Sequence, residues 1–323
     1  MNNNKMKKRK RKFIIMCIFI ISIICTGIVI YNFLQIKKEE ALQVKISKNS
    51  IKEYIDLVDE KSKDKVQLNW KEIYSIAGAI KNNVFESVDE KDAKEIADRF
   101  FIEKNIDGKK IIGIKSMDEV IKEMNLEEKI ALRAKANYKK FQTVGLVPNN
   151  LDKNSQNKLF IEEIKDEANN IYSNYGILPS ILIAQAALET GWGKSELSSK
   201  SNNLFGIKAD KSWKGPKVKM KTNENFKDVI YDDFRAYSSR NESIKDYGEF
   251  LKNNKRYRKN GVFEAKNYKD QAIAIENAGY STKSDKEGNL LYSTLLTNII
   301  RDNDLQLLDY NVIKEKNNKL LNR

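Results

Sequence analysis

The sequence predicts a mainly α-helical protein with one membrane-spanning helix and a small β-hairpin. Three observations support this prediction. An uncharged stretch of 24 residues runs from Phe13 to Ile36, apolar residues recur at helical spacing through most of the remaining chain, and short alternating segments gather in residues 213–237. A chain of 323 residues has room for one or two domains.

The N-terminal stretch has the length and flanks of a membrane anchor. About 20 apolar residues suffice to cross a bilayer, whereas the core of a signal peptide is roughly 7–15 residues long. Seven Lys and Arg residues precede the stretch and none lies within it. This asymmetry predicts a cytoplasmic basic tail over 1–12, a single transmembrane helix over 13–36 in the cell membrane, and an extracytoplasmic remainder. An uncleaved or atypical signal peptide is the alternative.

Composition excludes several classes of chemistry. The chain contains no histidine, so a Ser-His-Asp triad, a Cys-His nucleophile and an HExxH zinc site are all ruled out. Both cysteines, Cys17 and Cys25, fall in the apolar stretch, which leaves no thiol elsewhere for a nucleophile, a disulfide or a metal site. Acid–base chemistry must therefore use Asp, Glu, Tyr or Lys. No metal or organic cofactor is implied.

The net charge gives only a weak indication of partners. It is +14 for the whole chain and +7 once the seven basic residues before the apolar stretch are left out. A modest basic excess suits an anionic surface such as a membrane or a cell-wall polymer. Because the lysines are interspersed with acids, and because most of the chain is predicted to lie outside the cell, we expect no nucleic-acid partner.

Residues 37–150 are expected to form an extracytoplasmic helical domain or stalk. Apolar residues such as Ile51, Ile55 and Val58 follow helical spacing. The segments "VDEKDAKEIADRFFIEKN" and "MDEVIKEMNLEEKIALRAKANYKKF" continue this pattern, with acids early in each as helix starts prefer. No motif here indicates a binding function, and a protein partner for this region is left open.

A linker is predicted over residues 144–156, which gather Gly, Pro, Asn, Ser and Asp. Beyond it, residues 151–311 are expected to form a second, α-rich domain that begins with helices over about 157–174 and 179–190. "WKGPKVKMKT" and "VIYDDFRAY" alternate as the strands of a hairpin would. Residues 312–323 are expected to be a frayed basic tail.

Helices are predicted to return after the hairpin. Ser239 stands three residues before Glu242 in "SRNESIKDYGEFLKNN", the spacing of a capping box. "YKDQAIAIENAGY" and "NLLYSTLLTNIIRDNDL" complete the predicted helices of this domain.

Glu189 occupies an unusual place at the end of the second of the two early helices. Pro179 suits a first turn, the following residues are apolar on nearly every face, and Gly191 and Gly193 signal the helix end. An acid in the last turn faces the partial negative charge of the helix C-terminus, and its aliphatic neighbours disfavour ionisation. Both effects are expected to raise its pKa and keep it protonated, as a general acid requires. The alternative is a solvated glutamate at a frayed helix end.

The residues around Glu189 carry a family resemblance. "ALETGWGKS" followed by "SNNLFGIK" resembles the core motif of glycoside hydrolase family 73, bacterial N-acetylglucosaminidases that cut peptidoglycan and include flagellar rod-associated hydrolases and autolysins. "WKGP", "FRAYSSRNESIKDYGEFL", "YKDQAIAIENAGYST" and "LLYSTLLTNII" follow in the family's order, so the resemblance covers about residues 155–308. It implies a lysozyme-like α-helical fold with a small β-hairpin lobe.

The resemblance also implies three catalytic residues. Glu189, in "LETGWG", matches the general acid that protonates the glycosidic oxygen in an oxocarbenium-like transition state. Glu224, in "KTNENF", matches a second carboxylate 35 residues later, although this hairpin is shorter than in many relatives. Tyr280 matches a tyrosine near the cleaved bond, in "GYST" where the family more often has "GYATD". The rivals of Glu224 on the same hairpin are Asp228, Asp232 and Asp233.

Six further residues are candidates for sugar contacts. Aromatic faces suit pyranose rings and side-chain amides can bond sugar amides. Core packing explains Trp192 and Phe205 at least as well, and a turn explains the two asparagines. The six candidates are Trp192, Asn202, Asn203, Phe205, Trp213 and Tyr292.

Together these features predict a membrane-anchored endo-β-N-acetylglucosaminidase that cleaves the GlcNAc-β-1,4-MurNAc bond of peptidoglycan. One alternative is a muramidase or a lytic transglycosylase on the same fold; the latter needs a single carboxylate and leaves an anhydro sugar. Another is a non-catalytic glycan-binding scaffold of a wall-assembly complex, kept open by the long region over 37–150.

Overall fold

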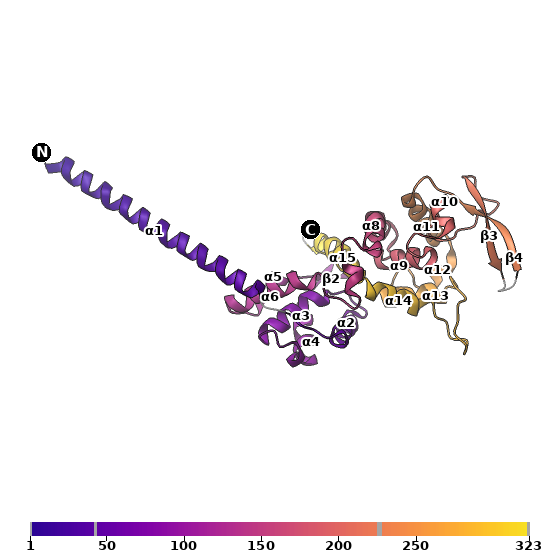
Figure 1. The fold of residues 1–323 in the computed structure, drawn as a ribbon, viewed down its shortest axis with the longest axis horizontal. Coiled ribbons are helices and arrows are strands. Elements are labelled where there is room, and N and C mark those ends of the chain that lie inside the picture. Colours follow the sequence, from indigo (N-terminus) through magenta and orange to yellow (C-terminus); the bar gives the residue numbers. More distant parts are fainter. Residues whose placement is uncertain (1, 42–43, 225–227, 322–323) are drawn as a thin grey trace.

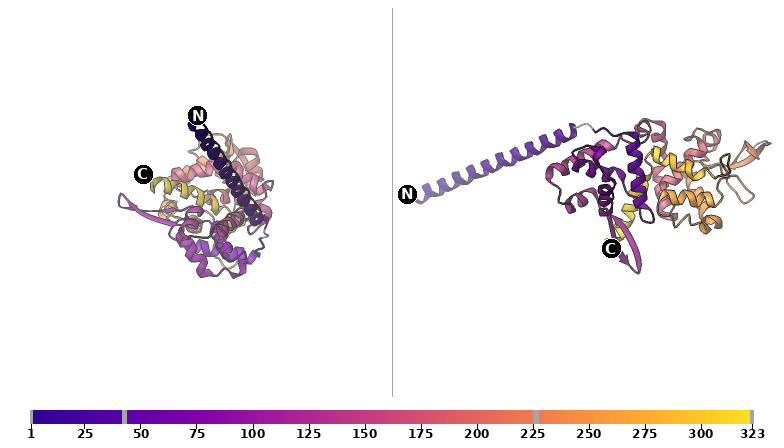
Figure 2. Two further views of the ribbon diagram at one scale, coloured as in Figure 1. Left: turned by 90° about the vertical axis from the view of Figure 1, so that its left-hand side faces the viewer. Right: turned by 90° about the horizontal axis from the view of Figure 1, so that it is seen from below.

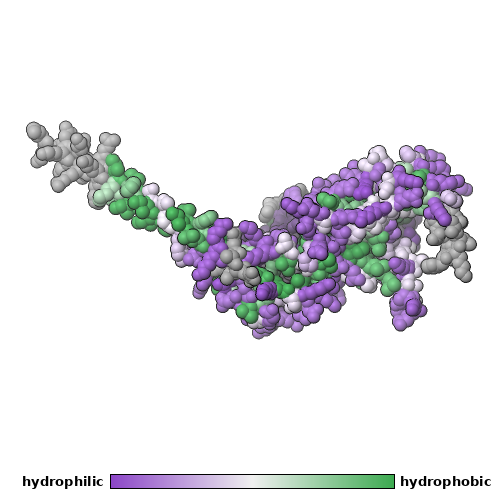
Figure 3. Space-filling view, viewed as in Figure 1, coloured by the Kyte–Doolittle hydropathy of each residue, from purple (hydrophilic) through white to green (hydrophobic). Residues whose placement is uncertain are grey.

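A single long helix, α1 (Asn2–Ala41), projects from the rest of the molecule in the computed structural model, which describes residues 2–41, 44–224 and 228–321 (Figure 1). Its segment Ile14–Lys38 has a mean hydropathy of 2.8 and is long and apolar enough to cross a membrane. The side chains described along it are mostly exposed, and Figure 3 shows a largely hydrophobic surface there. The anchor predicted over 13–36 therefore coincides with one continuous helix.

The region after α1 forms a small helical unit, as the spacing of its apolar residues predicted. Its helices bury Trp70, Ile73 and Ile76 almost completely, and Trp70 packs against the ring of Phe141. Ser116 and Glu119 make a full capping box at the start of one helix. The helices are α2 (Lys48–Ser62), α3 (Trp70–Ile80), η1 (Phe85–Ser87), α4 (Glu90–Arg99), α5 (Met117–Glu123) and α6 (Glu128–Phe141).

A β-hairpin within this unit corrects the prediction of continuous helix. β1 (Phe101–Ile106) pairs antiparallel with β2 (Lys109–Ile114), where the helical interpretation ran through "FFIEKN". The turn between them is Asp107–Gly108, and both residues have positive φ, at 50° and 73°. Two such residues form the turn that matches the twist of paired strands, and an Asp-Gly pair between apolar runs is its sequence signal. That signal was present in the sequence and was overlooked.

The remaining elements form a mainly α domain with a second hairpin, which confirms the predicted fold class. Both helices predicted before the hairpin occur, and the hairpin extends away from the helical body at the end opposite α1 (Figures 1 and 2). The elements are α7 (Pro148–Leu151), α8 (Gln156–Tyr175), α9 (Pro179–Thr190), α10 (Glu196–Ser201), β3 (Lys217–Glu224), β4 (Asp228–Arg235), α11 (Arg240–Asn253), α12 (Lys255–Lys259), α13 (Tyr268–Asn277) and α14 (Tyr292–Asp302).

Helix α9 lies at the centre of this domain. Ile181, Leu182, Ile183 and Ala184 are each fully buried, so successive residues on all sides of the helix meet protein. Helices α8, α13, α14 and the C-terminal helix α15 (Gln306–Leu321) pack around it. A helix that is apolar on all faces needs such enclosure, because any open face would expose apolar side chains to water.

The C-terminal segment is a helix, α15 (Gln306–Leu321), which corrects the predicted frayed tail over 312–323 as far as Leu321. Ile313 and Leu321 are buried, at 3% and 8% exposure. Asn318 accepts a hydrogen bond from the backbone N–H of Ile114 and donates one to its carbonyl. Helix α15 thus packs against β2. Because that strand was not predicted, the sequence did not show what would hold the C-terminal segment in place.

The N-terminal unit and the second domain share one continuous core. Between them lies a buried ion pair, in which the Lys71 ammonium is 2.6 Å from the Asp304 carboxylate, and the Trp70 indole donates to the same carboxylate at 3.4 Å. Tyr310 donates to Glu72 at 2.9 Å nearby. Residues 44–141 therefore do not stand apart from the second domain.

Candidate active site

The end of α9 delivers Glu189 to the surface through a tight turn. Gly191, Trp192 and Gly193 all have positive φ, at 58°, 63° and 75°. The Thr190 hydroxyl holds this turn, since it donates to the Ala186 carbonyl and accepts from the Gly193 N–H at 2.7 Å. Glycine adopts such φ values freely, whereas Trp192 does so at a cost of order 1 kcal/mol or more. Strain of this kind is typical of functional sites.

Glu189 faces an open cleft with one of its two oxygens bound. The Tyr292 hydroxyl donates to Oε1 at 3.0 Å, and no hydrogen bond to Oε2 is made by the residues that the structure describes. The side chain is open to solvent, yet the cleft walls displace enough water that desolvation raises the pKa of Glu189 above its usual range. The Tyr292 bond and the charge of Lys283 oppose this rise. The predicted direction of the pKa shift thus agrees with the structure.

A chain of buried hydrogen bonds stands behind Glu189. Gln185, one turn earlier on α9, donates from Nε2 to the Tyr292 hydroxyl at 3.1 Å, and its Oε1 accepts from the Tyr247 hydroxyl at 2.9 Å. Because the Tyr292 oxygen accepts from Gln185, its own proton is directed at Glu189. The chain therefore fixes Tyr292 as the donor to Oε1 and leaves Oε2 for the cleft.

Aromatic rings form the wall around this chain. Phe205 stacks on Tyr247 with 3.8 Å between centroids, and Tyr280 lies 5.2 Å from Tyr292 and 6.0 Å from Tyr247. Burial raises the pKa values of Tyr280 and Tyr292 well above the usual range for tyrosine. Both phenols are thus neutral hydrogen-bonding groups at any physiological pH. The structure brings together four predicted residues here: Glu189, Phe205, Tyr280 and Tyr292.

The cleft itself has a volume of about 470 Å³. Glu189 and aromatic residues line it, together with charged residues from the loop after α10, from β4 and from α12. These charged lining residues are Lys208, Asp210, Arg235 and Arg256.

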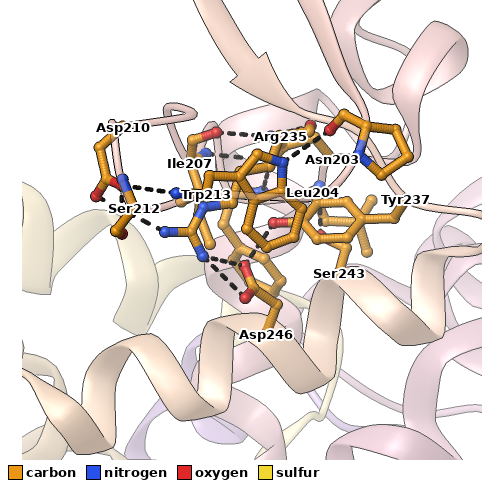
Figure 4. A network of polar contacts seen from close by, with 12 residues as sticks. Asn203, Leu204, Ile207, Asp210, Ser212, Trp213, Arg235, Tyr237, Ser243 and Asp246 are labelled. Atoms are coloured by element: carbon orange, nitrogen blue, oxygen red, sulfur yellow. Dashed lines mark hydrogen bonds and ion pairs between the residues drawn. The ribbon is translucent and has the colours of Figure 1, made fainter.

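Arg235 is locked in place by the network shown in Figure 4. Its Nη1 is 2.8 Å from each oxygen of Asp246, and the Tyr237 hydroxyl donates to the same carboxylate at 2.6 Å. Trp213 covers the guanidinium at 4.5 Å and donates from its indole to the Pro216 carbonyl at 2.8 Å. Gly215 also packs on this ring, because a Cβ there would lie 2.5 Å from Trp213 Cζ2. Trp213 thus supports Arg235, and its role as a sugar platform stays a prediction.

Three other candidates for sugar contacts make hydrogen bonds or packing contacts within the protein. The Asn203 amide is fully buried and makes hydrogen bonds with the backbone of Phe205, Ile207 and Arg235. Asn202 ends α10 with φ of 54° and donates to the Tyr237 carbonyl. Trp192 packs edge-on against Phe160, with 5.9 Å between ring centroids. These contacts fit the turn and core-packing alternatives.

The described side chains do not identify the second catalytic carboxylate that the sequence predicts on the hairpin. Glu224 ends β3, where its backbone pairs with that of Asp228, and the side chains of both residues lie outside the described part of the chain. Asp232 forms an ion pair with Lys208 at 2.7 Å, and Asp233 forms one with Lys217 at 2.5 Å. Hydrogen bonds from Lys208 and from the Asp233 backbone N–H lower the pKa of Asp232. Both aspartates are thus engaged in ion pairs with lysines.

Three residues of the site were not predicted from the sequence: Gln185, Tyr247 and Arg256. Gln185 carried a usable signal, because a lone amide in an otherwise apolar, fully enclosed helix must find a buried partner. Tyr247 and Arg256 carried none, since each is spaced like an ordinary helix residue. Within the described residues, no group of three or more His, Cys, Asp or Glu side chains could hold a metal ion.

Comparisons with known proteins agree on the second domain. Residues 165–305 match the Glucosaminidase family, described as "Mannosyl-glycoprotein endo-beta-N-acetylglucosaminidase". The chain is 39% identical over 162 residues to the exo-glucosaminidase LytG of Bacillus subtilis, covering 48% of this chain and 54% of that protein. It is 43% identical over 129 residues to the peptidoglycan hydrolase FlgJ of Vibrio cholerae, covering 38% of each.

Among solved structures, a peptidoglycan hydrolase mutant from Sphingomonas sp. A1 is 33% identical, covering 48% of this chain and 97% of that one, with a TM-score of 0.41. The chain spans about half the length, or less, of the curated relatives it matches.

Proposed function

Residues 165–305 belong to the glucosaminidase family, and on that premise we propose that the chain is a peptidoglycan hydrolase held at the membrane by α1. One observation supports this most directly: Glu189 presents an unbound carboxyl oxygen to a cleft, with its pKa raised and its other oxygen fixed by Tyr292. LytG and FlgJ are named as a glucosaminidase and a peptidoglycan hydrolase, which supports glycan as the substrate.

Glu189 acts as the general acid in this proposal. Its proton sits on Oε2, because Oε1 is occupied as an acceptor from Tyr292. As the bond between the anomeric carbon and the glycosidic oxygen breaks, the electron pair leaves with the oxygen and Oε2 supplies the proton. Positive charge develops on the sugar ring, and the carboxylate that remains beside it stabilises that charge. The oxygen of a water molecule then bonds to the anomeric carbon, and the proton that this water loses returns through solvent to Glu189, which restores the acid.

The second group that completes the reaction is proposed on the hairpin. Glu224 at the end of β3 would activate a water or stabilise the oxocarbenium ion, and a separation from Glu189 of about 5–5.5 Å would favour retention. Tyr280 lies beside Tyr292 in the cleft wall, where its phenol can orient the N-acetyl group of the substrate or a water. Phe205 supplies an apolar surface next to it.

The bond cleaved is proposed to be GlcNAc-β-1,4-MurNAc, attacked within the strand. The description of the matching family, an endo-beta-N-acetylglucosaminidase, supports internal cleavage. LytG is named an exo-enzyme, so release of single terminal residues is the second candidate.

We also propose that the catalytic domain lies outside the cell. The seven basic residues before the apolar stretch would keep the N-terminus in the cytoplasm. The hairpin of β3 and β4 lies at the end of the molecule opposite α1 (Figure 1), so the N-terminal unit would space the second domain from the membrane surface. Cutting would then be confined to glycan within reach of this spacer.

Digestion of purified peptidoglycan by the full chain in detergent tests the proposal. Wild type, Glu189→Gln and Glu224→Gln would be compared, and the product ends identified by borohydride reduction and mass spectrometry. Reducing GlcNAc ends from wild type, lost in Glu189→Gln, are expected; oligomeric products indicate internal cleavage and single GlcNAc residues terminal cleavage. Reducing MurNAc ends would identify a muramidase, and anhydro-MurNAc ends with activity retained in Glu224→Gln a transglycosylase. Bound but uncut glycan would identify a scaffold.

A further inference from the structure

Arg256 is an oriented cation in the cleft that the proposed chemistry does not use. It lines the same cavity as Glu189 and Tyr280. We infer that Arg256 is a subsite for a carboxylate on the muramic-acid residue of the glycan, either its lactyl group or its attached peptide. This inference rests on the proposed function, because it names the part of that substrate which the cleft selects.

The protein holds the Arg256 guanidinium in one orientation. Nη1 donates to the Gly279 carbonyl at 3.1 Å, Nη2 donates to the Tyr257 hydroxyl at 2.7 Å, and the guanidinium carbon lies 4.8 Å from the Tyr257 ring centroid. Gly279 immediately precedes Tyr280. The guanidinium is therefore fixed beside the tyrosine that borders Glu189. It has five N–H donors, and these two bonds leave others for a ligand.

Comparison with Arg235 shows why Arg256 suits an anion. Arg235 lines the same cleft, but Asp246 neutralises it and its side chain is only 13% exposed. Arg256 is exposed and makes no ion pair with any carboxylate that the structure describes; its partners are a carbonyl and a phenol, which are neutral. A planar guanidinium that is oriented yet not neutralised matches the fork geometry of a carboxylate.

Muramic acid is the sugar of peptidoglycan that carries such a group. In strands without peptides its lactyl ether ends in a free carboxylate, and in peptide-bearing strands the lactyl group is an amide and the anion belongs to the peptide. GlcNAc has neither. An anion subsite in the same cleft as Glu189 would thus fix the register of the strand, because only alternate sugars could place a carboxylate on Arg256.

Matched substrates test this inference. Peptide-free glycan strands would be compared with the same strands after their carboxyls are converted to neutral methylamides, and peptide-bearing strands treated in the same way. Affinity would be measured with the full chain carrying Glu189→Gln, which binds without cutting, and turnover with the chain that keeps Glu189. The readout is the ratio of charged to neutral substrate, in Kd and in kcat/KM.

We expect this ratio to favour the charged strands about tenfold or more, as a charge-assisted pair allows, and to fall toward one in Arg256→Gln. Arg256→Lys should keep part of it. Arg258→Gln, on the same helix but outside the cleft lining, is the control for net charge and should keep all of it. The type of strand that shows the ratio identifies the lactyl or the peptide carboxylate.

Two results would overturn the inference. One is a ratio near one in the parent protein. The other is an equal loss on charged and neutral strands in Arg256→Gln and Arg256→Lys alike, which would make Arg256 a support for the Gly279 turn only. Selective binding of charged strands without any turnover would instead sustain the subsite and refute the proposed hydrolysis, so the two failures are distinguishable.

Discussion

Two carboxyls meet opposite ends of α9, and the difference between them shows what prepares one of them for chemistry. Asp309 of α15 lies at the N-terminal end, is fully buried, and accepts hydrogen bonds from the Ser180 backbone N–H at 2.9 Å and from the Ser180 hydroxyl. Glu189 lies at the C-terminal end with Tyr292 on one oxygen and the cleft beside the other. A carboxyl with both oxygens bound fixes structure, whereas one with an unbound oxygen can transfer a proton.

The largest expected effect comes from replacing the reactive carboxyl. Glu189→Gln removes the transferable proton but keeps an oxygen that accepts from Tyr292, so kcat should fall by about 10²–10⁴-fold while the free energy of unfolding changes little. Steady-state hydrolysis and urea unfolding of the same preparation check both parts. If the variant retained a tenth of the activity, or lost several kcal/mol of stability, Glu189 would belong with Asp309 as a structural group.

The interface carboxyl Asp304 should behave in the opposite way. Asp304→Ala leaves the Lys71 ammonium, only 3% exposed, without its partner, which is expected to cost about 3–5 kcal/mol of unfolding free energy. The double variant Lys71→Met/Asp304→Leu should recover much of that loss, because no charge remains buried. Hydrolysis per folded molecule should stay near the wild-type value; a large fall in it would show that the interface acts on the cleft directly.

Asp309 should make stability depend on pH. Burial raises its pKa from the usual 3.8 to about 7, so the folded chain keeps a proton that the unfolded chain releases between these values. Stability from this group is therefore present below pH 4 and is lost as pH rises toward 7, by up to about 4 kcal/mol.

Asp309→Asn cannot titrate, and its amide can still bond both Ser180 groups. Between pH 4 and pH 8, its free energy of unfolding should therefore rise relative to that of wild type by up to about 4 kcal/mol. Urea unfolding at both pH values measures this difference. A difference between the two proteins that is constant with pH would mean that Asp309 is ionised in the folded chain.

The sequence was most informative where local pattern and local chemistry coincide. α9, its glycine-rich exit and the acid at its end all lie within 15 residues, and the structure has each of them. The hairpin lobe at 217–235 was also predicted, because strand alternation is a local signal.

Predictions failed where order depends on a distant partner. Asn317 and Asn318 of α15 form hydrogen bonds with the backbone of β2, and the buried Asp304 carboxylate pairs with the Lys71 ammonium. These partners are separated by more than 200 residues, so no window of sequence shows them. The surroundings of Trp213 show the same limit within the site, since Arg235 and Gly215 both contact its ring and no local pattern reveals this.

The hydrogen-bond chain behind Glu189 gives the subtlest test of the comparison between the two ends of α9. Tyr292→Phe removes the donor to Oε1, a bond that favours the carboxylate form, so the pKa of Glu189 should rise further. Because a general acid works only while protonated, the alkaline limb of the kcat/KM profile should move to higher pH, while kcat falls by roughly tenfold.

Tyr247→Phe is the matched variant for this test. It acts one link further away through Gln185 and should move the limb in the same direction by less. The contrary result would be a loss of activity in both variants with no movement of the alkaline limb. In that case the hydrogen-bond chain supports the cleft wall without changing the pKa of Glu189, and Oε1 is not reserved as an acceptor for Tyr292.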